Sequence, residues 1–123
     1  MTYGASPMKD KVPDDKKDLI LHTGLDVGMG KCSLMGSDYV AEFCCTDNKL
    51  VVGTNSCINL VPDTKEETDR LFQAFAGQEG SKVICPIGNQ FWGSYFGMVK
   101  DAFGVQWMFD FPLCDDEKKE NED

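Results

Sequence analysis

The chain has 123 residues, of which 41% are hydrophobic and 27% are charged, and this balance is that of one small globular domain. The composition excludes a collagen, a coiled coil and a wholly disordered chain. No stretch approaches the ~20 apolar residues that span a bilayer, and residues 1–18 hold no apolar run of the kind that a secretory signal needs. We therefore expect a cytoplasmic protein.

The net charge of −9 bears on the choice of partner. No basic patch is present to neutralise phosphates, so we expect neither nucleic acid nor an anionic membrane as a partner. Six acidic residues against two lysines fall in residues 113–123, which we interpret as an acidic, disordered tail.

The six cysteines show no spacing typical of a structural zinc site, because no C-x-x-C pair occurs. Most of them lie within apolar segments, and we expect free thiols rather than disulfides. They are Cys32, Cys44, Cys45, Cys57, Cys85 and Cys114.

The first half of the chain carries weak structural signals. Residues 1–17 are rich in Lys, Asp, Pro and Gly, which indicates a loop or a flexible N-terminal arm. Residues 19–25 and 32–35 read as two strands joined by a glycine-containing turn at 26–30. Residues 36–55 give mixed signals, and we leave most of them as loop.

The second half carries stronger signals, the strongest of which is a helix. A strand at residues 57–61 ends at Pro62, and Asp63 or Thr64 can cap the helix that follows. An apolar stripe at i, i+3, i+4 and i+7 marks the buried side of that helix, and Gly77 is a natural stop. We also expect an ion pair between Glu66 and Arg70. The stripe consists of Thr68, Leu71, Phe72 and Phe75.

Three further strands are predicted after the helix. Residues 82–85 form a short strand, and the aromatic, glycine-punctuated segment 91–99 a bent one. A turn at 101–104, with the Asp101 carboxylate bound to nearby backbone N–H groups, leads into a last strand at 105–111. The alternation in that strand places Trp107 on the face that packs under the helix. The fold class is α+β, with a body at residues 18–112.

Several segments together resemble a known family. Asn59-Leu60-Val61-Pro62-Asp63, Gln90-Phe91-Trp92-Gly93 and the run from Asp101 to Met108 resemble the PhnB-like branch of the vicinal oxygen chelate superfamily. This branch is also labelled 3-demethylubiquinone methyltransferase-like, and the superfamily includes glyoxalase I and the bleomycin-resistance proteins. The resemblance covers roughly residues 18–111 and implies a fold of two βαβββ modules around a cupped sheet.

The resemblance also implies that the chain is incomplete as a two-module fold. The second module is matched from Cys57 to Phe111, whereas only two strands match the first, whose N-terminal strand–helix–strand has no counterpart. The strand near Leu19 would then form an open edge, and exposed apolar surface favours self-association. We expect either a homodimer that closes the cup between subunits or a truncated gene product.

The resemblance argues against a metal site. Where the metal-using members carry His and Glu ligands, this chain has Ser56 or Cys57 and Met108, which are poor ligands for a hard divalent ion. His22 is the single histidine, and one imidazole cannot hold zinc or iron alone. We expect no metal and no other cofactor.

The residues that we expect to contact a ligand come partly from the resemblance. His22 is either a hydrogen-bonded strand histidine or a ligand contact in the cup, and Trp92 could line a pocket. Tyr95 stands where related proteins commonly carry an Arg, which puts an anionic substrate in doubt. Gln106 and Met108 share the face of the last strand that is turned away from Trp107. We assign no catalytic residue.

Three functions remain open at this stage. The first is a PhnB-like protein that binds a small molecule without a metal, or a degenerate member; we expect no enzyme, and no methyltransferase signature is present. The second is a metal-dependent lyase or isomerase whose site is completed by a partner subunit. The third is a drug-sequestering binder that resembles the bleomycin-resistance proteins. All three share one fold, which does not decide among them.

Overall fold

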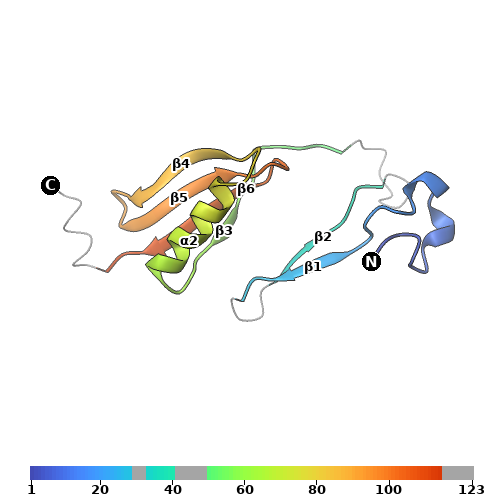
Figure 1. Ribbon diagram of the computed structural model, residues 1–123, viewed down its shortest axis with the longest axis horizontal. Coiled ribbons are helices and arrows are strands. Elements are labelled where there is room, and N and C mark those ends of the chain that lie inside the picture. Colours follow the sequence, from blue (N-terminus) through green and yellow to red (C-terminus); the bar gives the residue numbers. More distant parts are fainter. Residues whose placement is uncertain (29–32, 41–49, 115–123) are drawn as a thin grey trace. The chain divides into compact units, whose positions relative to one another are not determined.

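The computed structural model describes residues 1–28, 33–40 and 50–114, which form two compact units, Met1–Val51 and Val52–Asp123. Figure 1 shows the helices and strands of both units. The predictions for Cys32, Cys44 and Cys45 lie outside the described residues, as do residues 115–123 of the tail that we predicted at 113–123. Leu113, the first residue of that tail, is buried. No helix among the described residues is long and apolar enough to cross a membrane.

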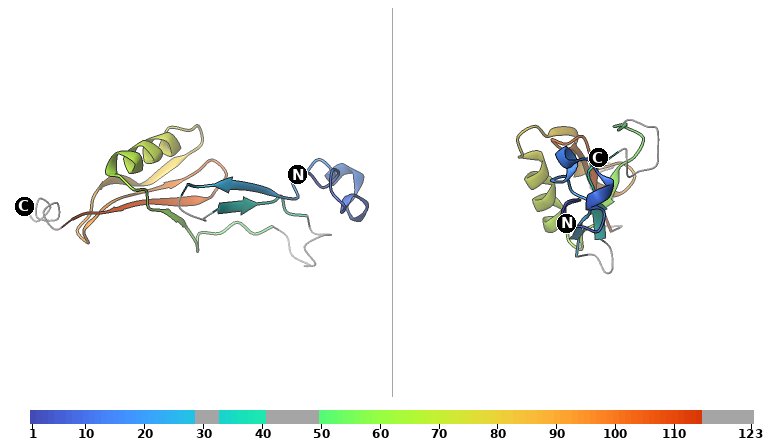
Figure 2. Two further views of the ribbon diagram at one scale, coloured as in Figure 1. Left: turned by 90° about the horizontal axis from the view of Figure 1, so that it is seen from below. Right: turned by 90° about the vertical axis from the view of Figure 1, so that its right-hand side faces the viewer.

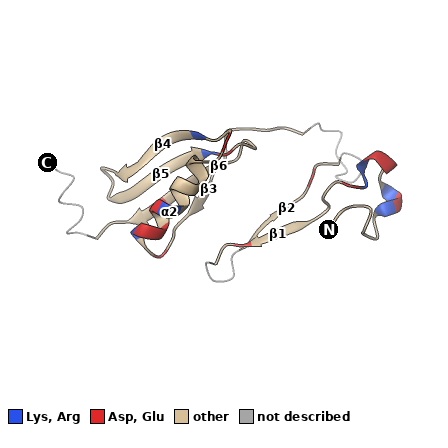
Figure 3. Ribbon diagram, in the orientation of Figure 1, with Lys and Arg blue, Asp and Glu red and all other residues tan. Residues whose placement is uncertain are grey.

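The first unit begins with a segment that contains short helices and buried residues, where we expected a loop or a flexible arm. Residues 1–17 contain two 3-10 helices, η1 (Lys9–Lys11) and η2 (Asp14–Lys16), which hold most of the unit's visible charge (Figure 3). Tyr3 is 1% exposed and shares a buried cluster with Val12 and Val40. Apolar residues far apart in the sequence, rather than local periodicity, therefore order this segment.

A two-stranded hairpin follows, as the sequence predicted. Strand β1 (Thr23–Asp26) pairs antiparallel with β2 (Ser33–Gly36), and Leu25 lies opposite Leu34. The strand begins later than residue 19 because Ile20 is engaged elsewhere: it forms a bridge with Thr2. Its backbone N–H also donates to Asp38 Oδ2 over 2.7 Å.

The second unit has the predicted α+β architecture. Its elements are β3 (Ile58–Leu60), α2 (Lys65–Ala76), β4 (Lys82–Asn89), β5 (Ser94–Lys100) and β6 (Gln106–Pro112). The strands form one sheet in the order β3-β6-β5-β4, in which β3 runs parallel to β6 and the other pairs are antiparallel. This is a βαβββ module, and α2 packs on one face of its sheet (Figure 2).

Helix α2 starts where its sequence predicts. The Thr64 hydroxyl accepts a hydrogen bond from the Glu67 N–H over 3.1 Å, which satisfies one of the free amides of the first turn. The helix ends at Ala76, and the Gly77 N–H donates to the Gln73 carbonyl. Arg70 forms its ion pair with Glu67, whereas the sequence predicted a pair with Glu66.

The core of the second unit lies between α2 and the sheet. Phe72 is 4% exposed and meets Phe109 edge to face at 5.8 Å between ring centroids. Phe75 contacts Phe109 at 5.1 Å and Trp107 at 5.0 Å, so Trp107 does pack under the helix as predicted. A Cβ added to Gly97 on β5 would lie 2.7 Å from a ring carbon of Phe72, so the helix approaches the sheet closely at this glycine.

Two strand boundaries differ from those expected. Strand β4 extends to Asn89 instead of ending at Cys85, and β5 begins at Ser94 instead of at Phe91. The reason is a tight turn between them: the Gln90 N–H donates to the Ser94 carbonyl over 2.8 Å, and Gly93 has φ 92°. Phe91 and Trp92 therefore lie in a turn rather than in a strand.

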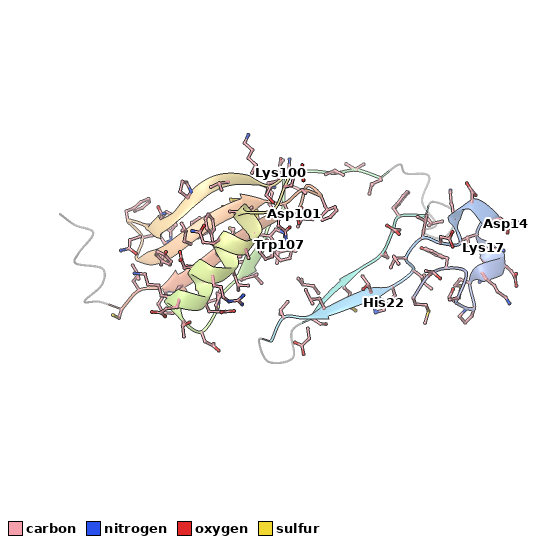
Figure 4. The ribbon with its side chains drawn as sticks, viewed as in Figure 1. Asp14, Lys17, His22, Lys100, Asp101 and Trp107 are labelled. Atoms are coloured by element: carbon pink, nitrogen blue, oxygen red, sulfur yellow. The ribbon has the colours of Figure 1, made fainter. Side chains whose placement is uncertain are left out.

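The turn between β5 and β6 is organised by Asp101, as the sequence predicted. One carboxylate oxygen accepts hydrogen bonds from the backbone N–H groups of Phe103 and Val105, each over 2.9 Å. The other oxygen accepts from Trp107 Nε1 over 2.9 Å, so the turn is also tied to the core (Figure 4). Three donors thus converge on one carboxylate.

We predict that Phe72→Ala lowers the free energy of unfolding by about 3–5 kcal/mol, because it removes the ring between helix and sheet. Gly97→Ala should also destabilise, by about 1–3 kcal/mol, because its methyl group would overlap that ring. Both tryptophans lie in the second unit, so denaturant unfolding followed by tryptophan fluorescence reports on this unit.

The matched control is Phe103→Ala, which removes a ring that is 86% exposed and should change stability by less than about 0.5 kcal/mol. A loss below about 1 kcal/mol for Phe72→Ala would show that this ring does not hold the helix on the sheet.

Candidate functional site

The strand register of the second unit divides its side chains between two faces. Val99, Gly97 and Tyr95 lie opposite Trp107, Phe109 and Phe111, and these residues form the face that α2 covers. The alternate residues form the other face, which we call the helix-free face. It carries Asn59, Ser94, Phe96, Met98, Lys100, Gln106, Met108 and Asp110.

Tyr95, one of the expected ligand contacts, lies on the helix side of the sheet, opposite Phe111. Its hydroxyl donates to Asp69 Oδ1 on α2 over 2.8 Å, and Lys65 Nζ lies 4.7 Å from the centre of its ring. Burial, together with the hydrogen bond to and the charge of Asp69, raises the pKa of Tyr95 to about 12. The side chain therefore fastens α2 to β5 as a neutral phenol.

Three of the expected ligand contacts meet on the helix-free face. Gln106 and Met108 lie on it from β6, and Met108 is directly opposite Met98. Trp92 reaches it from the β4–β5 turn, where its ring contacts Phe96 at 5.4 Å between centroids. Trp92 is half exposed, and its neighbour Phe91 is 94% exposed. Aromatic and thioether groups thus adjoin polar side chains on one surface.

Gln106 and Asp110 supply polar groups to this surface. The Gln106 side-chain amide reaches the Ser56 carbonyl at 3.4 Å, so it is tied to the segment before β3. Asp110 lies directly opposite Phe96, and its Oδ1 atom is buried without a hydrogen-bond donor among the described residues. A carboxylate in this state can accept a hydrogen bond from a ligand.

The alternation along β5 and β6 could have identified the further residues of this face. Phe96 and Met98 are not among the expected ligand contacts, because a bent strand over residues 91–99 leaves the alternation of its side chains undefined. Once the turn at Gly93 is known, period-two alternation assigns both side chains to the helix-free face.

His22 lies in the other unit and is exposed at the start of the hairpin, just before β1. Its backbone N–H donates to the Met1 carbonyl over 3.2 Å. The helix-free face consists of residues of the second unit and does not include His22.

Metal ligands do not gather among the residues that the structure describes. No group of three or more His, Cys, Asp or Glu side chains in those ranges could hold a metal ion. Cys57 and Cys85 are free thiols, and Cys85 lies opposite Met98 at the β4 edge of the sheet.

No family model and no curated protein matches the chain. A solved structure, protein PA1353 from Pseudomonas aeruginosa, superposes with a TM-score of 0.72 at 37% sequence identity, over 92% of this chain and 75% of that one. The chain belongs to the family of protein PA1353.

A second solved structure shares the fold. The PhnB protein from Bacillus cereus superposes with a TM-score of 0.58 at 19% identity, over 80% of this chain and 68% of that one. The PA1353 family member described here therefore has a PhnB-like α+β fold, as the sequence resemblance implied. The chain spans three quarters of the length of PA1353.

The role of Tyr95 can be tested by alkaline titration. We predict that Tyr95→Phe removes a phenolate step near pH 12, which absorbance spectroscopy would detect. Because the folded-state pKa is raised, this group's contribution to stability is complete below the ordinary tyrosine pKa of about 10 and is lost as the pH rises towards 12.

Asp69→Asn is the second variant in this experiment. It removes the negative charge beside the phenol, so Tyr95 should then ionise at a lower pH. An unchanged step near pH 12 in Tyr95→Phe would contradict the assignment of that step to Tyr95.

Proposed function

We propose that this protein is a PhnB-like member of the vicinal oxygen chelate superfamily that binds a small, partly apolar molecule on its helix-free face without a metal ion. The observation that carries the proposal is the convergence of Trp92, Phe96, Met98 and Met108 on the face of the sheet turned away from α2. A sheet face of this composition, not packed under α2, is typical of an interaction surface.

The side chains of this face suit contact with an apolar ligand. The rings of Trp92 and Phe96 offer flat apolar surface. Met98 and Met108, which lie opposite each other, are flexible and polarisable and can adjust to an irregular ligand. Binding here needs no coordination chemistry.

A few polar groups beside this apolar area support a ligand site rather than a purely structural contact. Asn59 lies opposite Met108 on β3, and Gln106 and Asp110 flank Met108 along β6. Small-molecule sites commonly combine an apolar lining with a small number of oriented polar groups. The fold shared with the PhnB protein is compatible with this role but does not establish it.

The proposal is tested with Nile red, a neutral dye whose fluorescence rises in an apolar environment. We expect the dye to bind, and Trp92→Ala to weaken its binding by about two- to tenfold because one aromatic contact is lost. Phe103→Ala is the matched control, because it removes another exposed ring from a hairpin turn of the same sheet. Equal effects of the two variants would contradict a site at Trp92.

Native mass spectrometry of the purified protein separates this function from metal-dependent catalysis and from self-association. We expect no stoichiometric metal, and dye binding that chelator treatment leaves unchanged. A chelator that abolishes dye binding would favour a metal-dependent site. A dimer that forms as dye binding disappears would show that a second copy of the chain occupies the face.

A further inference from the structure

The carboxylate of Asp110 suggests the chemical class of the ligand. We propose that the helix-free face selects an organic cation. A protonated nitrogen of this ligand bonds to Asp110, while an attached ring packs against Phe96 and Trp92. This inference rests on the proposed function of the same face.

Asp110 lies within an apolar part of the sheet. It is directly opposite Phe96 on β5, and its neighbours on the same side of β6 are Met108 and Pro112. Its Oδ1 atom is buried and receives no hydrogen bond from the described residues. Burying a carboxylate oxygen away from water without a hydrogen-bond donor costs free energy, and folded proteins rarely contain such an atom.

The chain itself does not supply a cation at this point of the described structure. The ion pairs found there join Lys17 to Asp14 and Arg70 to Glu67, and neither includes Asp110. The basic residue that β5 contributes to this face is Lys100, which lies opposite Gln106. Gln106 is four residues from Asp110 along β6. Four residues of strand correspond to about 13 Å, which is too far for an ion pair.

A ligand cation would complete the environment of this carboxylate. A protonated nitrogen donates a charge-assisted hydrogen bond to the Asp110 carboxylate, and such bonds are stronger than neutral ones. The rings of Phe96 and Trp92, in contact at 5.4 Å, lie on the same side of the sheet and can hold the apolar part of the ligand. They also attract cations through their π faces. A flat aromatic amidine satisfies both requirements.

The test compares naphthalene-2-carboxamidine with naphthalene-2-carboxamide, which have nearly the same shape but differ in charge. Each is titrated into the full-length protein while backbone amide signals are followed by NMR. We expect the amidine to bind about tenfold more tightly than the amide, with shifts centred on Phe96 and Asp110. Asp110→Asn should remove this preference and leave amide binding within about twofold of the unaltered protein.

Glu66→Gln is the matched control, since it removes one negative charge from an exposed position on α2, the helix on the other side of the sheet. It should leave the tenfold preference unchanged. The comparison of the two compounds on the unaltered protein needs no variant, so the test stands even if Asp110→Asn fails to fold.

The outcomes separate this inference from the proposed function. If both compounds bind the helix-free face equally well, the cation preference is wrong and the apolar binding site stands. If the preference survives Asp110→Asn, or is lost in Glu66→Gln, a group other than Asp110 creates it and the inference is overturned. If neither compound shifts signals on this face and Nile red does not bind, the proposed function fails as well.

Discussion

The close approach of Phe72 to Gly97 determines how the second unit is built. No side chain fits between the helix and the middle of β5, because a Cβ on Gly97 would lie 2.7 Å from the Phe72 ring. That contact fixes α2 over one face of the sheet, where Phe109, opposite Gly97 on β6, and Val99, two residues along β5, are both 0% exposed. The chemistry of the other face follows from this choice, since alternate residues must point away from the helix.

The apolar composition of the helix-free face would be unfavourable if the sheet had only a structural role. Such a sheet would place short polar side chains on the side that α2 does not cover, as antiparallel sheets with one solvated face do. Here Phe96, Met98 and Met108 occupy that side, and Asp110 has a buried oxygen without a donor among the described residues. Local departures from the rules of folding are expected where a protein binds something.

The sequence predicted most of the second unit because its signals are local. The Thr64 cap and the apolar stripe define the helix, and the alternation around Trp107 defines β6, so each element can be read within a dozen residues. The order at residues 1–17 could not be predicted in this way. It comes from Tyr3, whose burial depends on Val12 and Val40, and such long-range packing leaves no periodic pattern.

The candidate site was predicted less well, and the reason is register. Tyr95 and Phe96 are neighbours on one strand, and their side chains point to opposite faces of the sheet: Tyr95 bonds to α2, and Phe96 contacts Trp92. A register shift of one residue would exchange the two faces. The sequence of the aromatic segment does not state where its strand begins, because Trp92, Tyr95 and Phe96 all suit a strand. The turn at Gly93 decides the matter, and its φ of 92° is a backbone property that the glycine permits but does not require.

The register also bears on the proposal that the site binds its ligand without a metal ion. The resemblance implies Met108 in the place of a metal-binding Glu and Ser56 or Cys57 in the place of a metal-binding His, and the Gln106 side-chain amide contacts the Ser56 carbonyl oxygen. A thioether contributes to apolar contact and binds hard cations poorly. Asp110 lies two residues farther along the same face, and the described residues contain no group of three or more His, Cys, Asp or Glu side chains that could hold a metal ion. A single carboxylate among apolar groups is suited to one hydrogen-bonded cationic group, and not to the several ligands that a divalent ion requires.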